Sequence, residues 1–119
     1  MTSKASEFRN QMIRMRGNFV AVHHERHDRL ELLLEQVAKS GDPWPAIAEA
    51  EMILHKIAGA AGTFGMIDLG LCARQVEGLI RSKRAAGALD RDTLFNALDA
   101  FLDISLEICN PTGEMQYAS

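Results

Sequence analysis

Apolar residues recur every three or four positions along most of this chain, and that spacing restricts its fold more than any other feature. Three stripes show it: Leu30, Leu33, Leu34 and Val37; Leu69, Cys72, Val76, Leu79 and Ile80; and Leu94, Leu98, Phe101, Leu102 and Cys109. An α-helix turns about 100° per residue, so residues at this spacing share one face of a helix. The alternation typical of a strand is absent from the sequence. The pattern therefore predicts an all-α protein.

Turn signals divide the chain into helical segments. The sequence Ser-Gly-Asp-Pro at 40–43, with Asp42 as an N-cap, marks one boundary. Gly65, Gly87 and the pair at 110–111 mark the others, and Asp90 is suited to cap the last helix. With Gly17 as a further interruption, we expect helices near 4–16, 18–39, 44–64, 68–86 and 91–109.

Long amphipathic helices joined by short connections favour antiparallel neighbours. The expected architecture is an up-down-up-down antiparallel four-helix bundle with an extra N-terminal helix. We divide the chain into a helical extension at 1–17, the bundle at 18–110 and a loose tail at 111–119.

Composition excludes several classes of function. The chain has 13 Lys and Arg against 16 Asp and Glu, a formal net charge of −3, which argues against a nucleic-acid partner. No apolar run approaches the roughly 20 residues that span a bilayer, so we expect no membrane partner. Cys72 and Cys109 form no disulfide framework and lie on apolar stripes, so we expect them in the core. A reduced, cytoplasmic setting fits best.

The segment from 46 to 65 places a histidine away from the core. On a helix, one arc gathers Ala46, Ala50, Ile53, Leu54, Ile57, Ala61 and Phe64. His55 points about 150° from the centre of that arc and should therefore be exposed. Gly59 and Gly62 lie alongside it, with Glu51 and Ala58 at the edges of the same stripe.

Glycine inside a helix costs about 0.5–1 kcal/mol relative to alanine, so two glycines near His55 need a reason. Their absent side chains would leave the imidazole clear and let a partner's backbone approach. Small residues can also permit close packing between helices, but the helical wheel places these two outside the core arc. We therefore expect a partner-docking surface made of Gly59, Gly62, Ala58, Lys56, Glu51 and Met52.

An exposed imidazole is a poor general base without a cleft, but it is a competent nucleophile when neutral. In-line phosphoryl transfer to a ring nitrogen suits it, with charge stabilisation supplied by the partner. The sequence has no Gly-rich nucleotide loop with its lysine. We expect a stoichiometric phosphate carrier without an ATP site, rather than an enzyme.

The run from His55 to Gly65, HKIAGAAGTFG, resembles the signature of histidine-containing phosphotransfer (HPt) domains of bacterial phosphorelays. It is also similar to the phosphoacceptor domain of chemotaxis kinases. The family pattern has glycines four, seven and ten residues after the histidine, and all three are present. The resemblance extends from about Phe19 to Leu106.

The resemblance implies a four-helix bundle with His55 phosphorylated at Nε2. It implies response-regulator receiver domains and a sensor or hybrid histidine kinase as partners, and no cofactor except Mg²⁺ on the receiver. Glu77 matches the family position that holds the other ring nitrogen, which would fix the tautomer. The family usually has lysine three residues after the histidine, where this chain has Ala58, and Lys56 points about 100° away.

Two other functions compete with a phosphate carrier. The missing lysine is compatible with a receiver-binding adaptor of the same fold that transfers no phosphate. A metal-binding bundle could use His23, His24 and His27, although the sequence offers no third ligand beside the pair at 23 and 27, and we expect no metal.

Two further features lie outside these hypotheses. The basic run of Arg81, Lys83 and Arg84 complements a helix C-terminus, or alternatively docks an acidic receiver surface. Trp44 is expected to fasten the loop before it to the bundle.

Overall fold

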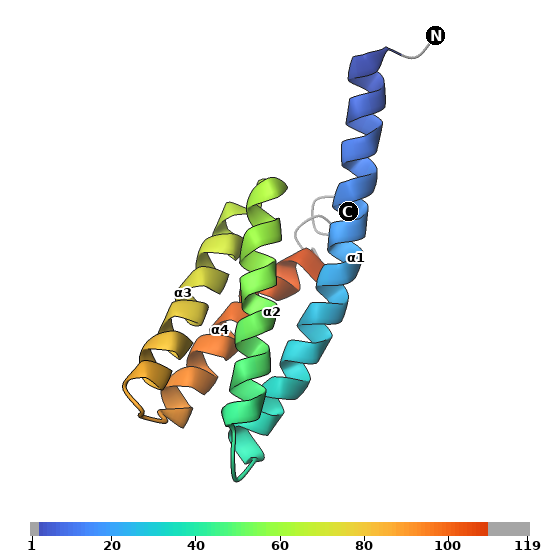
Figure 1. The fold of residues 1–119 in the computed structure, drawn as a ribbon. Helices are drawn as coiled ribbons and strands as arrows, with labels where there is room; N and C mark the ends of the chain where they lie inside the picture. Colours follow the sequence, from blue (N-terminus) through green and yellow to red (C-terminus); the bar gives the residue numbers. More distant parts are fainter. Residues whose placement is uncertain (1–2, 110–119) are drawn as a thin grey trace.

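The structure, a computed structural model, describes residues 3–109 and contains an all-α bundle (Figure 1). Its helices are α1 (Lys4–Lys39), α2 (Trp44–Thr63), α3 (Ile67–Ala85) and α4 (Arg91–Cys109). Helix α1 packs against α2 and α4, and α3 packs against the same two helices. The α2–α3 side of the bundle therefore lies opposite the α1–α4 side. The all-α four-helix class is confirmed, whereas the loose tail expected at 111–119 lies outside the described residues.

The N-terminal extension is helical but is not a separate helix. Helix α1 runs through Gly17 without interruption, so the break expected there is wrong. A glycine weakens a helix by only about 1 kcal/mol, which the good helix formers around it outweigh. Ser3 begins the helix by accepting a hydrogen bond from the Ser6 N–H at 3.1 Å. The 36 residues of α1 make it far longer than its neighbours, and its first half projects beyond them (Figure 1).

The other helix ends follow local signals in the sequence. Gly65 and Gly87 adopt φ values of 74° and 67°, the left-handed conformation that terminates helices most readily with glycine. Asp90 accepts a hydrogen bond from the Thr93 N–H at 3.2 Å and so caps α4. Asp42 accepts one from the Trp44 N–H at 3.3 Å, although Pro43 occupies the N-cap position itself.

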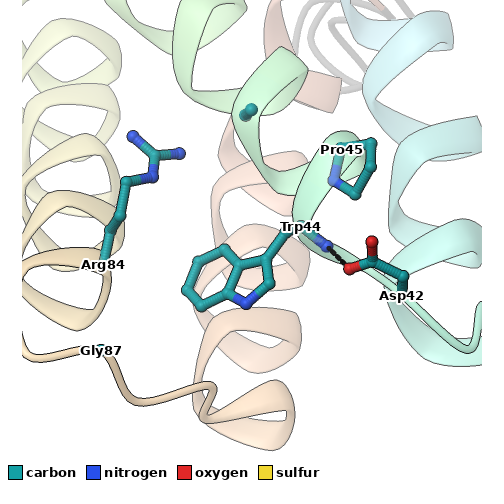
Figure 2. Close-up of a pocket in the computed structure, with 6 residues that line it drawn as sticks. Asp42, Trp44, Pro45, Arg84 and Gly87 are labelled. Atoms are coloured by element: carbon teal, nitrogen blue, oxygen red, sulfur yellow. Dashed lines mark hydrogen bonds between the residues drawn. The ribbon is translucent and has the colours of Figure 1, made fainter.

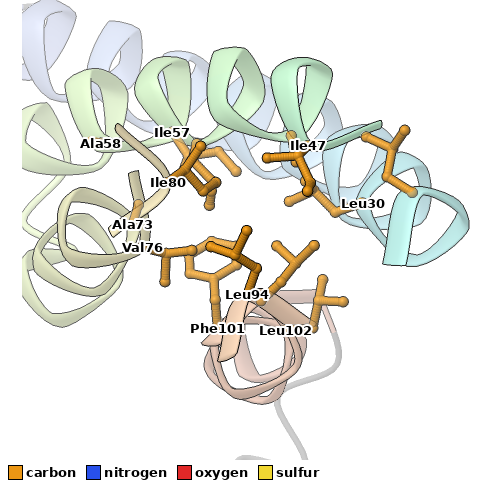
Figure 3. Close-up of a cluster of buried hydrophobic side chains, with 14 of the residues drawn as sticks. Leu30, Ile47, Ile57, Ala58, Ala73, Val76, Ile80, Leu94, Phe101 and Leu102 are labelled. Atoms are coloured by element: carbon orange, nitrogen blue, oxygen red, sulfur yellow. The ribbon is translucent and has the colours of Figure 1, made fainter. Parts of the chain in front are cut away.

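The core lies between the four helices and contains most residues of the predicted stripes, whereas Leu34, Cys72, Leu79 and Cys109 are half-buried (Figure 3). Its largest fully buried apolar side chains are Phe101, Leu30, Leu33, Ile47, Leu54 and Ile57. Most of the core arc predicted on α2 is buried, but Ile53 and Phe64 are half-buried. Cys72 and Cys109 are also half-buried, and burial raises the pKa of both thiols.

A polar cluster is buried where α1 meets α4. The Ser105 hydroxyl lies 2.6 Å from His23 Nε2 and 2.8 Å from His27 Nδ1, and His27 Nε2 lies 2.6 Å from a Glu31 carboxylate oxygen. With neutral rings, His27 donates to Glu31 and accepts from the Ser105 hydroxyl, which accepts from His23. These bonds fix the register between the two helices.

None of the helices within residues 3–109 combines the length and apolar character needed to cross a membrane.

Candidate functional site

His55 projects from the middle of α2, and 69% of its side chain is exposed. Its neighbours Leu54 and Ile57 are fully buried, so the core face of α2 fixes the outward direction of His55. Gly59 and Gly62 are exposed on the same side. A Cβ atom at either glycine would meet nothing within 4 Å, so close packing inside the protein does not explain them. The exposed imidazole with open space beside it agrees with the sequence-based expectation.

Glu77 on α3 holds the ring of His55. Its side chain is only 7% exposed, and its Oε2 atom lies 2.7 Å from His55 Nδ1. Because a carboxylate accepts hydrogen bonds, Nδ1 carries the proton and donates it to Glu77. The other ring nitrogen, Nε2, is then the unprotonated nitrogen of the neutral ring. The contact predicted for Glu77 is present.

Two arginines on α3 connect this pair to α2. Arg81 Nη2 donates to the same Glu77 oxygen at 2.7 Å, and Arg81 Nε donates to Glu51 at 3.0 Å. Arg84 donates to the other Glu51 oxygen. Glu51, expected as a docking side chain, is therefore mostly buried in an ion-pair network, with 14% of its side chain exposed.

The sequence analysis does not predict this network, because it assigns Arg81 and Arg84 to a helix C-terminus or to a docking surface. The four-residue spacing of Glu77 and Arg81 is the signal that could have identified their ion pair. The bonds to Glu51 depend on how α2 and α3 pack, so no local pattern indicates them. Lys83, the third residue of the basic run, pairs instead with Asp90 at 3.2 Å.

Ala58 is not an exposed docking residue, because only 5% of it is accessible. Its carbonyl oxygen lies 3.7 Å from where a Cβ atom would stand on Gly70, which allows α2 and α3 to approach closely. Helix α3 covers Ala58 because it packs closely on α2. A helical-wheel analysis of α2 by itself contains no information about this neighbouring helix. The expectation that Ala58 belongs to the docking surface is therefore wrong.

Two hollows flank His55. One is lined by Ala48, Met52 and Lys56 of α2 together with Glu77, Arg81 and Arg84 of α3. The other is lined by Ala58 and Gly59 of α2 and by Arg74, Glu77, Gly78 and Arg81 of α3. Arg81 borders both hollows. Met52 and Lys56 are exposed as expected, and a guanidinium stands beside the histidine.

Trp44 begins α2 at the far end of this surface. It lines an open pocket with Asp42, Pro45, Ala48, Arg84 and Gly87. Figure 2 shows the indole extending from the start of α2 into the space between α2 and Arg84. Trp44 is half-buried and packs against the core, in agreement with the role predicted for it in fastening the loop.

The clustered histidines do not form a metal site in the part of the chain that the structure describes. Both ring nitrogens of His27 and one of His23 are engaged in hydrogen bonds, and His24 is exposed. Within residues 3–109 there is no group of three or more His, Cys, Asp or Glu side chains arranged to hold a metal ion.

The site is therefore an exposed histidine, oriented by a carboxylate, on the surface of a four-helix bundle. Comparison with family models agrees: the model of the Hpt domain matches residues 14–107. The chain belongs to the Hpt domain family, whose members carry phosphoryl groups in phosphorelay signalling and interact with receiver domains and kinases. Neither the curated proteins nor the solved structures compared with it include a match.

Proposed function

We propose that His55 is the phosphoacceptor of this Hpt domain and exchanges a phosphoryl group with the aspartate of a receiver domain. The observation that carries the proposal is the 2.7 Å bond between Glu77 and His55 Nδ1 on a largely exposed ring. That bond selects the tautomer in which Nε2 is the nucleophile. No other histidine within residues 3–109 combines an exposed ring with such a bond, because His23 and His27 are buried and the exposed His24 makes no side-chain hydrogen bond there.

In the transfer step, the Nε2 lone pair of His55 attacks the phosphorus of the receiver's aspartyl phosphate. The N–P bond forms as the P–O bond to the aspartate breaks, and the aspartate leaves as a carboxylate. The ring keeps its Nδ1 proton and becomes a cation, which Glu77 stabilises through the same hydrogen bond. Mg²⁺ on the receiver would balance the phosphoryl charge there. In the reverse reaction, the N–P bond breaks and the phosphoryl group passes from His55 to the aspartate of a second receiver.

We assign to Arg81 the positive charge that the family usually supplies by lysine at the position of Ala58. Arg81 borders both hollows beside His55, and 59% of its side chain is exposed and can reach a bound group. Its bond to Glu77 also positions the carboxylate that holds the ring. Arg74 borders one of the hollows and adds a second cation. Arg81 and Arg74 of α3 thus supply the positive charge that a lysine at the position of Ala58 would have supplied from α2.

The receiver would dock on the α2–α3 side of the bundle. Gly59 and Gly62 leave room for its backbone, while Met52 and Lys56 flank the histidine. Ile67 and Leu71 are 64% and 54% exposed and border a hollow next to Gly62, so they extend the surface with apolar contacts. A small contact area of this kind suits a carrier that must release its partners quickly.

Phosphotransfer from a phosphorylated receiver tests the site directly. Wild-type protein should acquire an acid-labile, alkali-stable label, and His55→Gln should acquire none while keeping the helical circular-dichroism spectrum of the wild type. A label that persists in His55→Gln would refute the assignment. If His55→Gln still binds the receiver and supports signalling, whereas Gly59→Arg abolishes both, the protein is a phosphate-independent adaptor.

The role of Arg81 is tested by the rate of the same reaction. Arg81→Met should slow transfer about tenfold, because an exposed cation contributes less than the buried donors whose loss costs 100-fold or more. Arg81→Lys should recover part of the rate. Lys83→Met is the matched control, since Lys83 pairs with Asp90 away from His55, and it should transfer at the wild-type rate. Equal rates for Arg81→Met and Lys83→Met would contradict the assignment.

A further inference from the structure

Within residues 3–109, the part of α1 that precedes Phe19 has no side chain buried against the bundle. Residues 4–18, here called the arm, are exposed or half-exposed, and the first buried residue of α1 is Phe19. Apolar side chains in the arm face solvent: Phe8 is 66% exposed and Ile13 is 62% exposed. The arm carries four basic residues, Lys4, Arg9, Arg14 and Arg16, and one acidic residue, Glu7. It is a basic helix with uncovered apolar surface.

A groove of opposite character lies between α1 and α4. Four carboxylates border it, Glu31 and Glu35 from α1 and Asp99 and Asp103 from α4. Leu34, Leu102 and Leu106 give it an apolar lining, and no lysine or arginine is among the residues that form it. Leu106 is 48% exposed, so the apolar lining is open to solvent at this residue, whereas Leu34 is half-buried and Leu102 is buried. An apolar helix with basic side chains would complement the groove.

The arm and the groove lie along one face of α1. Arg9, Ile13, Arg16 and Val20 follow one another at intervals of three or four residues, and His27, Glu31 and Leu34 continue the series. One face of a single helix is therefore basic in its first half and acidic in its second half. Two such faces match each other when the helices run antiparallel.

We propose that two copies of this chain pair through antiparallel α1 helices, each arm lying in the α1–α4 groove of the other copy. The two contacts are equivalent by two-fold symmetry, so the assembly closes as a dimer. The paired segment, from about residue 6 to residue 34, corresponds to about 42 Å of helix. Arg9 and Arg16 of the arm meet the groove carboxylates, and Ile13 covers part of the apolar lining.

The dimer leaves the phosphotransfer site free. The groove is on the α1–α4 side of the bundle, whereas His55 and Glu77 lie on the α2–α3 side. Both copies could therefore engage a receiver at once. This pairing stands on different residues from the proposed function and does not depend on it.

The solution mass of the full chain tests the pairing, by light scattering after size-exclusion chromatography and by sedimentation equilibrium. Wild type should be a dimer at low salt, and raising the salt from about 0.05 M to about 0.5 M should weaken it because the contact is largely ionic. Arg9→Glu with Arg16→Glu reverses the arm, and Glu35→Lys with Asp103→Lys reverses the groove. Each double variant should raise the dimer dissociation constant at least tenfold.

Mixing the two double variants distinguishes this pairing from other dimers. In a mixed pair, the reversed arm meets the reversed groove and the natural arm meets the natural groove, so the mixture should regain the dimer mass. Arg14→Glu and Glu25→Lys are matched controls on other faces of α1, and each should leave the dissociation constant within about threefold of wild type. Circular dichroism verifies that all variants are folded.

A monomeric mass for wild type at every attainable concentration would overturn the proposal. So would a dimer that both double variants leave intact, or a mixture that stays monomeric although each variant is folded. The phosphotransfer assay of His55→Gln tests only the proposed phosphoacceptor. Neither of its outcomes changes what the mass measurements say about the dimer.

Discussion

At the scale of single residues, two histidines of this chain have opposite environments and opposite consequences. The ring of His55 is mostly exposed and held by a carboxylate, which is the arrangement a nucleophile needs. His23 is fully buried, and its Nδ1 atom has no hydrogen-bond partner. Burial, together with the nearby His27 and Arg26, lowers the pKa of His23 to about 4. A proton on His23 would have to enter a site with no acceptor for it.

The depressed pKa of His23 predicts a loss of stability in acid. Below pH about 6.5, His23 binds a proton in the unfolded chain but remains neutral in the folded protein until the pH nears 4. The free energy of unfolding therefore falls as the pH drops from about 6.5 to 4. The loss attributable to His23 is roughly 2 to 3 kcal/mol. Urea unfolding at pH 7.5 and pH 4.5 measures it, and His23→Gln should show the smaller pH dependence.

His24→Gln provides the control for this measurement. His24 is exposed and is the smallest of the four causes that lower the pKa of His23, so His24→Gln should change the pH dependence of unfolding much less than His23→Gln. An unchanged pH dependence in His23→Gln would show that the buried ring is not responsible.

At the scale of helices, α2 gives up stability on its exposed face. Gly59 and Gly62 have helical backbone and no neighbour that a Cβ atom would meet, so they leave a gap beside His55 without any packing requirement. Gly70 on α3 is different, because a Cβ atom there would stand 3.4 Å from the Ala61 side chain. Glycines therefore leave open space on one face of the α2–α3 pair and allow close helix packing on another.

Gly59→Ala should stabilise the fold and slow transfer. Alanine is favoured over glycine within a helix by about 0.5–1 kcal/mol, and its methyl group meets open space here. The same methyl group would intrude on the surface that the receiver approaches. Thermal unfolding and the initial rate of phosphotransfer measure the two effects.

Gly17→Ala separates helix propensity from docking. Gly17 is also exposed within a helix with open space around it, but it lies on α1 away from His55. Gly17→Ala should therefore stabilise the fold about as much as Gly59→Ala does, while phosphotransfer proceeds at the wild-type rate. A transfer rate for Gly59→Ala equal to that of Gly17→Ala would argue against a docking role for Gly59.

At the scale of the whole molecule, the arm and the bundle are separable. In the part of the chain that the structure describes, no residue of the arm is buried, and the family match begins at residue 14, close to where the bundle starts. The arm therefore contributes charge and apolar surface rather than stability.

A chain that begins at residue 14 should fold as well as the full chain and transfer phosphate at the same rate. Its free energy of unfolding should match within about 0.5 kcal/mol when both proteins are measured as monomers at high salt. It should lose the dimer mass at low salt. A large loss of stability would show that the first 13 residues pack on the bundle after all, and the denaturant midpoint reports it.

The sequence alone determined the features that repeat locally. Apolar spacing placed the core faces of the helices, glycines at 65 and 87 ended two of them, and the outward direction of His55 followed from its position relative to Leu54 and Ile57. Even Glu77 was indicated, through its place in a family pattern. Apart from the contact of Glu77, these features depend on backbone geometry within one helix or at its end, which a single sequence segment encodes.

Tertiary structure decided what lies between helices. The packing of α3 on α2 buries Ala58 and places Glu51 within hydrogen-bond distance of Arg81 and Arg84. The sequence of α2 alone predicts both Ala58 and Glu51 on the docking surface. The bonds of His23 and His27 to Ser105 join residues about 80 positions apart. Side chains on separate helices meet only after the core fixes distance and rotation between those helices, so no local pattern contains their contacts.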